Sequence, residues 1–137
     1  MGKLGRIAAV ASVSVLLLGG AAMVAPGASG SHHHHHHDVS RSGTCSVAGR
    51  WRLELDDMMM MDRIGVHFEI WSATGGQVWK VRLADNGTVF SHGPRMMGRY
   101  GHFMIYTWAR DQSGTDRIVA RGVNRATGEV CRGVASI

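Results

Sequence analysis

The sequence predicts an all-β domain, an antiparallel β-sandwich or small barrel of about seven short strands. Apolar and polar residues alternate in several short runs, and turn-forming residues separate these runs. Successive side chains of a strand point to opposite faces, so each alternating run has one face suited to a core. After residue 37, no apolar pattern with the helical period interrupts these runs.

The first 28 residues have the features of a secretion signal. Lys3 and Arg6 supply positive charge, an apolar stretch covers residues 7–18, and small residues follow. Cleavage after Gly27 or Ala28 is favoured over a retained membrane anchor, because the apolar stretch is rich in glycine and alanine. The mature protein is therefore expected to be secreted, extracellular and free of any membrane span.

Residues 29–44 are predicted to be a flexible segment that contains six consecutive histidines, His32 to His37. The composition favours an expression tag, and a native metal-binding tract is the alternative. Residues 45–137 are expected to form the β-sandwich domain, a length suited to one core. Removing Lys3 and Arg6 lowers the formal net charge from +5 to +3, which permits an acidic partner without requiring one.

Two cysteines, Cys45 and Cys131, lie near opposite ends of the domain. An isolated pair in an exported protein predicts a disulfide. Free thiols are the alternative. Neither cysteine has a second cysteine close in sequence or an activating motif, so a catalytic thiol is disfavoured.

The first predicted strand covers residues 49–55, where apolar Trp51, Leu53 and Leu55 alternate with charged residues. Residues 56–62 break this alternation. Two further alternating runs follow at 63–71 and 78–83, separated by Thr74-Gly75-Gly76. We expect these two runs to be antiparallel neighbours joined by that turn, with the rest of the chain covering their apolar face.

The remaining strands are shorter. Asp85-Asn86-Gly87 is a turn signal, because Asn and Gly tolerate positive φ. Residues 91–99, which contain Gly93-Pro94, are expected to form an irregular loop. Strands are expected at residues 88–90, 101–109, 116–123 and 129–133.

Two segments resemble known families. Residues 45–51, which end in Gly49-Arg50-Trp51, resemble the opening strand of calycin barrels such as avidins and lipocalins. The chain from Trp51 onward, above all residues 101–103, 114–120 and 127–131, resembles secreted bacterial immunoglobulin-like or fibronectin-III-like domains. The second resemblance implies an immunoglobulin-like β-sandwich, which is a fold and not an activity. The two cysteines would join the start of this domain to its last strand, in place of the usual inter-sheet disulfide.

The predicted strand 101–109 is apolar on both faces, and both cannot be buried in one core. Exposed aromatic side chains often mark contact sites. The alternative is a central strand whose second face is covered by loops. The expected partner-binding residues are Trp71, His102, Met104, Tyr106 and Trp108, with His67 beside Trp71 on another strand.

Four consecutive methionines have three interpretations: a packing loop that covers one end of the sandwich, an adaptable contact loop, or a soft site for Cu(I). Packing is favoured, because consecutive side chains on a strand do not all point one way, and no cofactor is expected. The soft-metal candidates are Met58, Met59, Met60, Met61 and His92, with Met96, Met97, Met104 and His102 as further members.

Outward-facing basic residues form another candidate site. Together they would make a stripe for an anionic cell-surface polymer or a nucleic acid. A solvated face that keeps the domain soluble is favoured over this, and no specific nucleic-acid partner is expected. The residues are Arg50, Arg52, Lys80, Arg82, Arg117 and Arg121.

The sequence favours a non-enzymatic binding module that uses the aromatic face or the Met-rich loops to contact an unknown protein or cell-surface polymer. It contains no nucleophile-elbow pattern, no His-Glu-x-x-His motif and no phosphate loop, so no catalytic residues are assigned. One alternative is a secreted inhibitor of an extracellular enzyme that presents residues 91–99. Another is an extracellular copper-binding protein.

Overall fold

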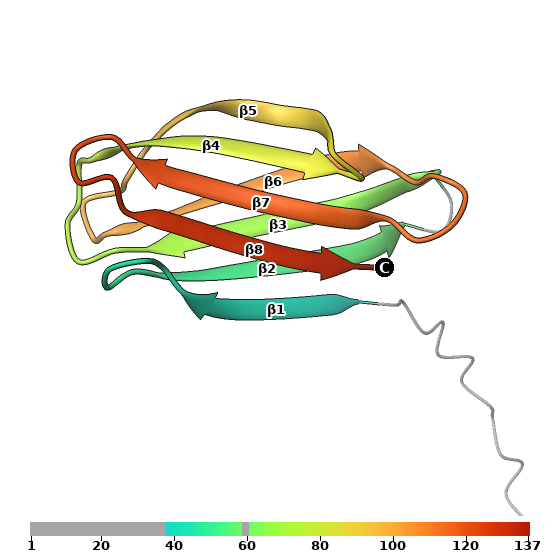
Figure 1. Cartoon of the computed structure of the whole chain (residues 1–137), viewed down its shortest axis with the longest axis horizontal. Coiled ribbons are helices and arrows are strands. Elements are labelled where there is room, and N and C mark those ends of the chain that lie inside the picture. Colours follow the sequence, from blue (N-terminus) through green and yellow to red (C-terminus); the bar gives the residue numbers. More distant parts are fainter. Residues whose placement is uncertain (1–37, 59–60) are drawn as a thin grey trace, which may run out of the picture. The chain divides into compact units, whose positions relative to one another are not determined.

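The computed structural model describes residues 38–58 and 61–137, and the predicted signal peptide and histidine tract lie outside this part of the chain. Within the described residues, eight antiparallel strands form two four-stranded sheets, which confirms the predicted all-β sandwich (Figure 1). Sheet A contains, in spatial order, β1 (Val39–Thr44), β2 (Arg50–Met58), β3 (Arg63–Trp71) and β6 (His102–Arg110). Sheet B contains β5 (Thr88–Met96), β4 (Val78–Asp85), β7 (Arg117–Asn124) and β8 (Val130–Ser136).

Four hairpins stay within one sheet: β1 with β2, β2 with β3, β4 with β5, and β7 with β8. The connections at 72–77, 97–101 and 111–116 pass from one sheet to the other. In the described residues, no helix is long and apolar enough to cross a membrane.

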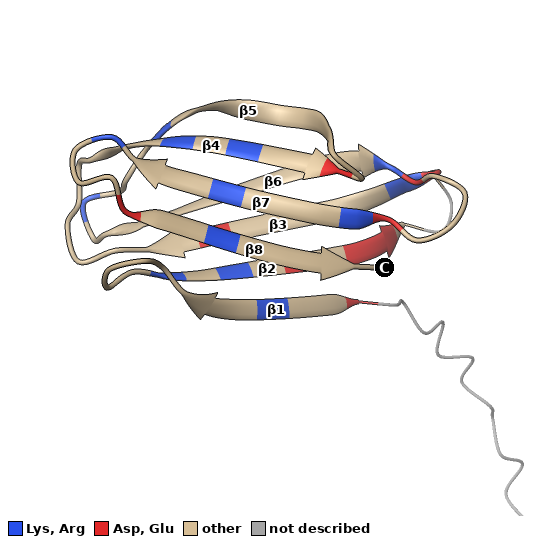
Figure 2. Cartoon of the chain, viewed as in Figure 1, with Lys and Arg blue, Asp and Glu red and all other residues tan. Residues whose placement is uncertain are grey.

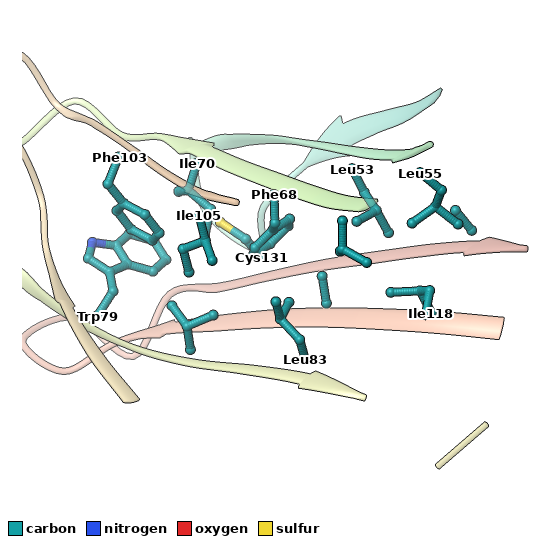
Figure 3. Packing of buried hydrophobic residues seen from close by; sticks show 14 of the residues in the cluster. Leu53, Leu55, Phe68, Ile70, Trp79, Leu83, Phe103, Ile105, Ile118 and Cys131 are labelled. Carbon is teal, nitrogen blue, oxygen red and sulfur yellow. The ribbon is translucent and has the colours of Figure 1, made fainter. Parts of the chain in front are cut away.

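The apolar faces of the two sheets meet in one core (Figure 3). The alternation in the sequence correctly predicts which residues are buried there. They include Leu53, Leu55, Ile64, Val66, Phe68, Ile70, Trp79, Val81, Leu83, Ile105 and Ile118.

Trp51 is the exception, since it is only partly buried. A Cβ atom at Gly43 or Gly133 would lie 2.8 or 2.7 Å from the Trp51 ring. Only glycine at these positions of β1 and β8 leaves room for the indole.

The predicted disulfide between Cys45 and Cys131 is present, with 4.2 Å between the Cα atoms. It joins the start of the domain to its last strand, as expected, and it also links the β1–β2 turn of sheet A to sheet B. The buried Glu129 carboxylate reinforces this junction, because it accepts hydrogen bonds from the backbone N–H groups of Ala48 at 2.9 Å and Gly49 at 2.7 Å.

One pairing prediction is wrong: β3 and β4 are not neighbours. They lie in different sheets, and β3 pairs with β6 while β4 pairs with β7. The connection 72–77 is held against the β5–β6 connection by backbone hydrogen bonds from Ser72 to Gly101 and from Gly76 to Met97. Alternation fixes which face of a strand is apolar, but it does not identify the neighbouring strand.

Two predicted irregular segments are strands. Residues 39–44, expected to be flexible, form β1, and most of residues 91–99 forms the edge strand β5. Pro94 has no N–H group, which an edge strand tolerates.

Strand order does not exclude the immunoglobulin-like resemblance. In immunoglobulin domains strands A, B and E share one sheet, and strands C, F and G share the other. With β1 as an additional leading strand, β2, β3 and β6 correspond to the first set, and β4, β7 and β8 correspond to the second. The resemblance stays a prediction.

Candidate binding surface

The outer side of sheet A carries three large exposed side chains in a row along β6. Met104, Tyr106 and Trp108 have exposed fractions of 55%, 53% and 49%. They alternate with the buried side chains of Phe103 and Ile105. Because β6 is an edge strand, the row lies along one border of the sheet.

The predicted partner-binding residues lie together on this side. Trp71 of β3 is directly opposite His102 of β6, and their rings stack with centroids 5.1 Å apart. Tyr106 and Trp108 meet edge to face at 5.6 Å, with an interplanar angle of 78°. We call these two residues, with Trp71, His102 and Met104, the aromatic face.

A line of charged groups crosses the sheet beside the aromatic face. His67 lies between two carboxylates: Nδ1 is 3.4 Å from Oε2 of Glu54, and Nε2 is 3.3 Å from Oε1 of Glu69. Glu54 also pairs with Arg52. The charges of β2 and β3 therefore neutralise one another largely within the face.

Glu69 is the most enclosed member of this line. Nε2 of His102 lies 3.9 Å from its Oε1 atom. The buried Nε2 atoms of His67 and His102 both lie near this carboxylate without forming a hydrogen bond to a described residue. Sequence reasoning did not place Glu69 beside the two histidines, because alternation does not show that β6, which carries His102, pairs with β3.

A hollow of about 440 Å³ adjoins the aromatic face on the β1 side. Arg50 connects the two regions, because it is opposite both Thr44 of β1 and Trp71 of β3. The lining residues are Ser42, Gly43, Thr44, Arg50, Trp51, Arg52 and Trp71. The surface thus combines aromatic contact area with arginine hydrogen-bond donors.

The residues considered as candidates for a soft-metal site, an interpretation less favoured than packing, are dispersed. Met59 and Met60 lie outside the described residues, Met58 ends β2 of sheet A, and His92 lies in β5 of sheet B. Met97 is buried in the core. Among the described residues, no group of three or more His, Cys, Asp or Glu side chains is arranged to hold a metal ion.

The candidate basic stripe, which the sequence favours less than a solvated face, is divided between the two sheets. Arg50 and Arg52 lie in β2 of sheet A, whereas the other four residues lie in β4 and β7 of sheet B: Lys80, Arg82, Arg117 and Arg121. The six residues therefore do not form one continuous surface, but the four in sheet B lie on neighbouring strands.

A second hollow, of about 500 Å³, lies at one end of the sandwich, where Asp85, Arg110 and Gln112 contribute to its lining. The Gln112 side chain donates to Asp85 at 2.6 Å, and its backbone N–H donates to Asp116 at 3.1 Å. Burial raises the pKa of Asp116 above its ordinary value of 3.8, and the neighbouring Asp85 carboxylate raises it further. No sequence motif indicated this carboxyl pair.

Comparisons with protein-family models, curated proteins and solved structures find no match to this chain.

Proposed function

We propose that this chain is a secreted, non-enzymatic binding module that acts at or outside the cell surface and contacts its partner through the outer side of sheet A. The main support for this proposal is the row formed by Met104, Tyr106 and Trp108, whose side chains are each about half exposed. Leaving apolar area in water costs about 25 cal/mol per Å². A contiguous group of such side chains is typical of a surface that a partner covers.

The composition of this surface favours a protein partner. Tyr, Trp, Met and Arg are enriched at protein interfaces, whereas Lys is depleted. The strands of sheet A contain no lysine, and Arg50 and Arg52 are exposed beside the aromatic face. The steep angle between the Tyr106 and Trp108 rings also disfavours a flat stacking platform for sugars.

One further observation supports secretion: the Cys45–Cys131 disulfide is typical of oxidising compartments outside the cytosol. The non-enzymatic role rests on the sequence, which contains none of the catalytic motifs considered above. Of the three histidines outside the tract, His92 lies in sheet B, whereas His67 and His102 both lie near Glu69 in sheet A. The alternative function, a secreted enzyme inhibitor, assumed that residues 91–99 form a loop that contacts the enzyme. Most of these residues instead belong to strand β5.

The direct test is binding of the chain to exported proteins of the organism that produces it, with variants on and off the aromatic face. Trp108→Thr is expected to weaken capture by about tenfold or more, since aromatic anchors contribute about 2 kcal/mol at interfaces. Met96→Thr is the control, because Met96 is 71% exposed on β5 of the other sheet. Equal capture by both variants, with melting temperatures unchanged, would refute the proposal.

A further inference from the structure

The outer side of sheet B carries a row of three arginine side chains with a histidine at one end. Arg82 of β4 is directly opposite Arg121 of β7, and Arg121 is directly opposite Arg132 of β8. His92 of β5 continues the row on the other side of Arg82. All four side chains are exposed. Neighbouring strands are about 4.8 Å apart, so the row extends over roughly 14 Å.

No acidic group neutralises this row. The four strands of sheet B contain one acidic residue, Asp85, which is only 4% exposed. In the described part of the chain, Arg82, Arg121 and Arg132 form no ion pair. In Figure 2, blue bands lie side by side on β4, β7 and β8, and on these three strands red appears only at or beside the ends.

Like charges placed directly opposite each other destabilise a sheet. On sheet A, Arg52 is directly opposite Glu69 and also pairs with Glu54, and the like-charge pair of Arg63 and Arg110 is confined to one end of the sheet. Solubility alone is served by mixed charges. A row of arginines without neighbouring carboxylates lowers the stability of the fold. Residues that lower stability in this way are expected at functional positions.

A hollow of about 390 Å³ extends the cationic surface past the row. Lys80 and Arg125 contribute to its lining, together with His92, Gly93 and Pro94. Arg125 is fixed next to β4 by a 2.9 Å backbone hydrogen bond to Val78. The surface therefore offers an anionic chain several consecutive contacts.

We propose that Arg82, Arg121 and Arg132 bind a linear acidic polysaccharide that carries about one anionic group per sugar. A guanidinium group holds a carboxylate or sulfate with two parallel hydrogen bonds, and the strand spacing is close to the length of one sugar in an extended chain.

The lack of exposed aromatic side chains on β4, β7 and β8 disfavours single-stranded nucleic acid as the ligand of this row. Its binding sites combine positive charge with aromatic stacking platforms. The only aromatic residue of β4, β7 and β8 is Trp79, which is fully buried.

The test uses the full chain and a fluorescently labelled polyuronate such as alginate, with EDTA present so that the histidine tract holds no metal. Binding is measured by fluorescence anisotropy at about 50 and 200 mM salt, and affinity is expected to fall with salt. The triple variant Arg82→Gln, Arg121→Gln, Arg132→Gln is expected to bind about tenfold more weakly or worse, because three charge-assisted contacts are lost.

The matched control carries Arg41→Gln, Arg63→Gln and Arg110→Gln, which remove the same charge from sheet A. It is expected to bind within about twofold of the unchanged chain, since it leaves the row intact. The sheet B variant should also melt at the same or a higher temperature in low salt, because like-charge repulsion is relieved.

Three results would overturn the proposal: no binding to alginate or to heparin at low salt, equal losses in both triple variants, or tighter binding to oligothymidine or to phosphatidylglycerol vesicles than to the polysaccharides. The last result would assign the row to a nucleic acid or a membrane.

Discussion

The Asp116 carboxyl group is buried at one end of the sandwich. Its backbone exchanges two 3.1 Å hydrogen bonds with Ile137, so this residue fixes the end of the described chain to the start of β7. Burial raises its pKa, and the Asp85 carboxylate raises it further. The charged form is therefore less favourable in the folded protein than in the unfolded chain.

This shift predicts how stability depends on pH. An acid whose pKa is higher in the folded state gains stability as pH falls from neutral through its folded pKa toward the ordinary value of 3.8. Asp116→Asn removes the titrating group and keeps an oxygen that can accept from Gln112. We expect the variant to gain stability relative to the unchanged protein at pH 7, and this advantage to shrink at acidic pH.

Urea unfolding of both proteins at several pH values measures this difference. A constant difference in unfolding free energy across the range would show that Asp116 does not titrate as its burial implies.

At the residue scale, alternation predicts side-chain direction well. It identifies the buried side of β2, β3 and β4, because successive side chains point to opposite faces and only one face of each strand is apolar. It could not decide which side of β6 is exposed, because that strand is apolar on both faces. It could not identify the row completed by Arg132. That row depends on which strands are neighbours, and the predicted stripe combined residues of different sheets.

At the scale of elements, pattern reasoning did not find β1, and it found only residues 88–90 of β5. β5 contains Gly93 and Pro94 and lacks clean alternation, because an edge strand with one covered side is under weaker patterning constraints. β1 is short and polar, with most of its residues exposed. Both strands are ordered by backbone pairing with a neighbour, which a single-strand pattern does not reveal.

Truncating a side chain on the inner side of sheet A should lower the unfolding free energy more than truncating one on its outer side. Phe68 is fully buried, so Phe68→Ala is expected to lower the unfolding free energy by about 3–5 kcal/mol. Trp108 is half exposed, and Trp108→Thr is expected to cost less than half of that amount.

Chemical denaturation of the two variants makes this comparison. Similar losses would place Trp108 among the structural residues of the domain and remove it from the proposed binding surface.

At the scale of the whole molecule, the disulfide links parts of the chain 86 residues apart. Closing a loop of this size restricts the unfolded chain and is expected to contribute about 4–5 kcal/mol to the unfolding free energy. The double variant Cys45→Ser, Cys131→Ser should therefore unfold at markedly lower denaturant concentration.

The control for this variant is Ser46→Ala in the same turn, which removes one hydrogen bond to Val130 and leaves the covalent link intact. If the double variant lost no more stability than the control, the disulfide would not be a main stabilising element.

The fold class and the disulfide were predictable because both follow from local patterns and from a single possible cysteine pair. Sheet order was not, since β3 with β6 and β4 with β7 are pairings between segments distant in the sequence. The two outer sides of the sandwich therefore acquire their distinct chemistry only from the tertiary arrangement. Sheet A presents aromatic side chains with balanced charges, and sheet B presents an unneutralised arginine row.

Site-specific photo-cross-linking tests the central claim most directly. A photoreactive amino acid is placed either at Met104 on the aromatic face or at Met96 on β5, and each protein is irradiated with exported proteins of the producing organism. These positions are matched, since both methionines are exposed on edge strands of opposite sheets. A discrete adduct from position 104 that is absent from position 96 and lost with Trp108→Thr is the predicted result. The same adducts from both positions, or none from position 104, would contradict the assignment of the aromatic face as the partner-binding surface.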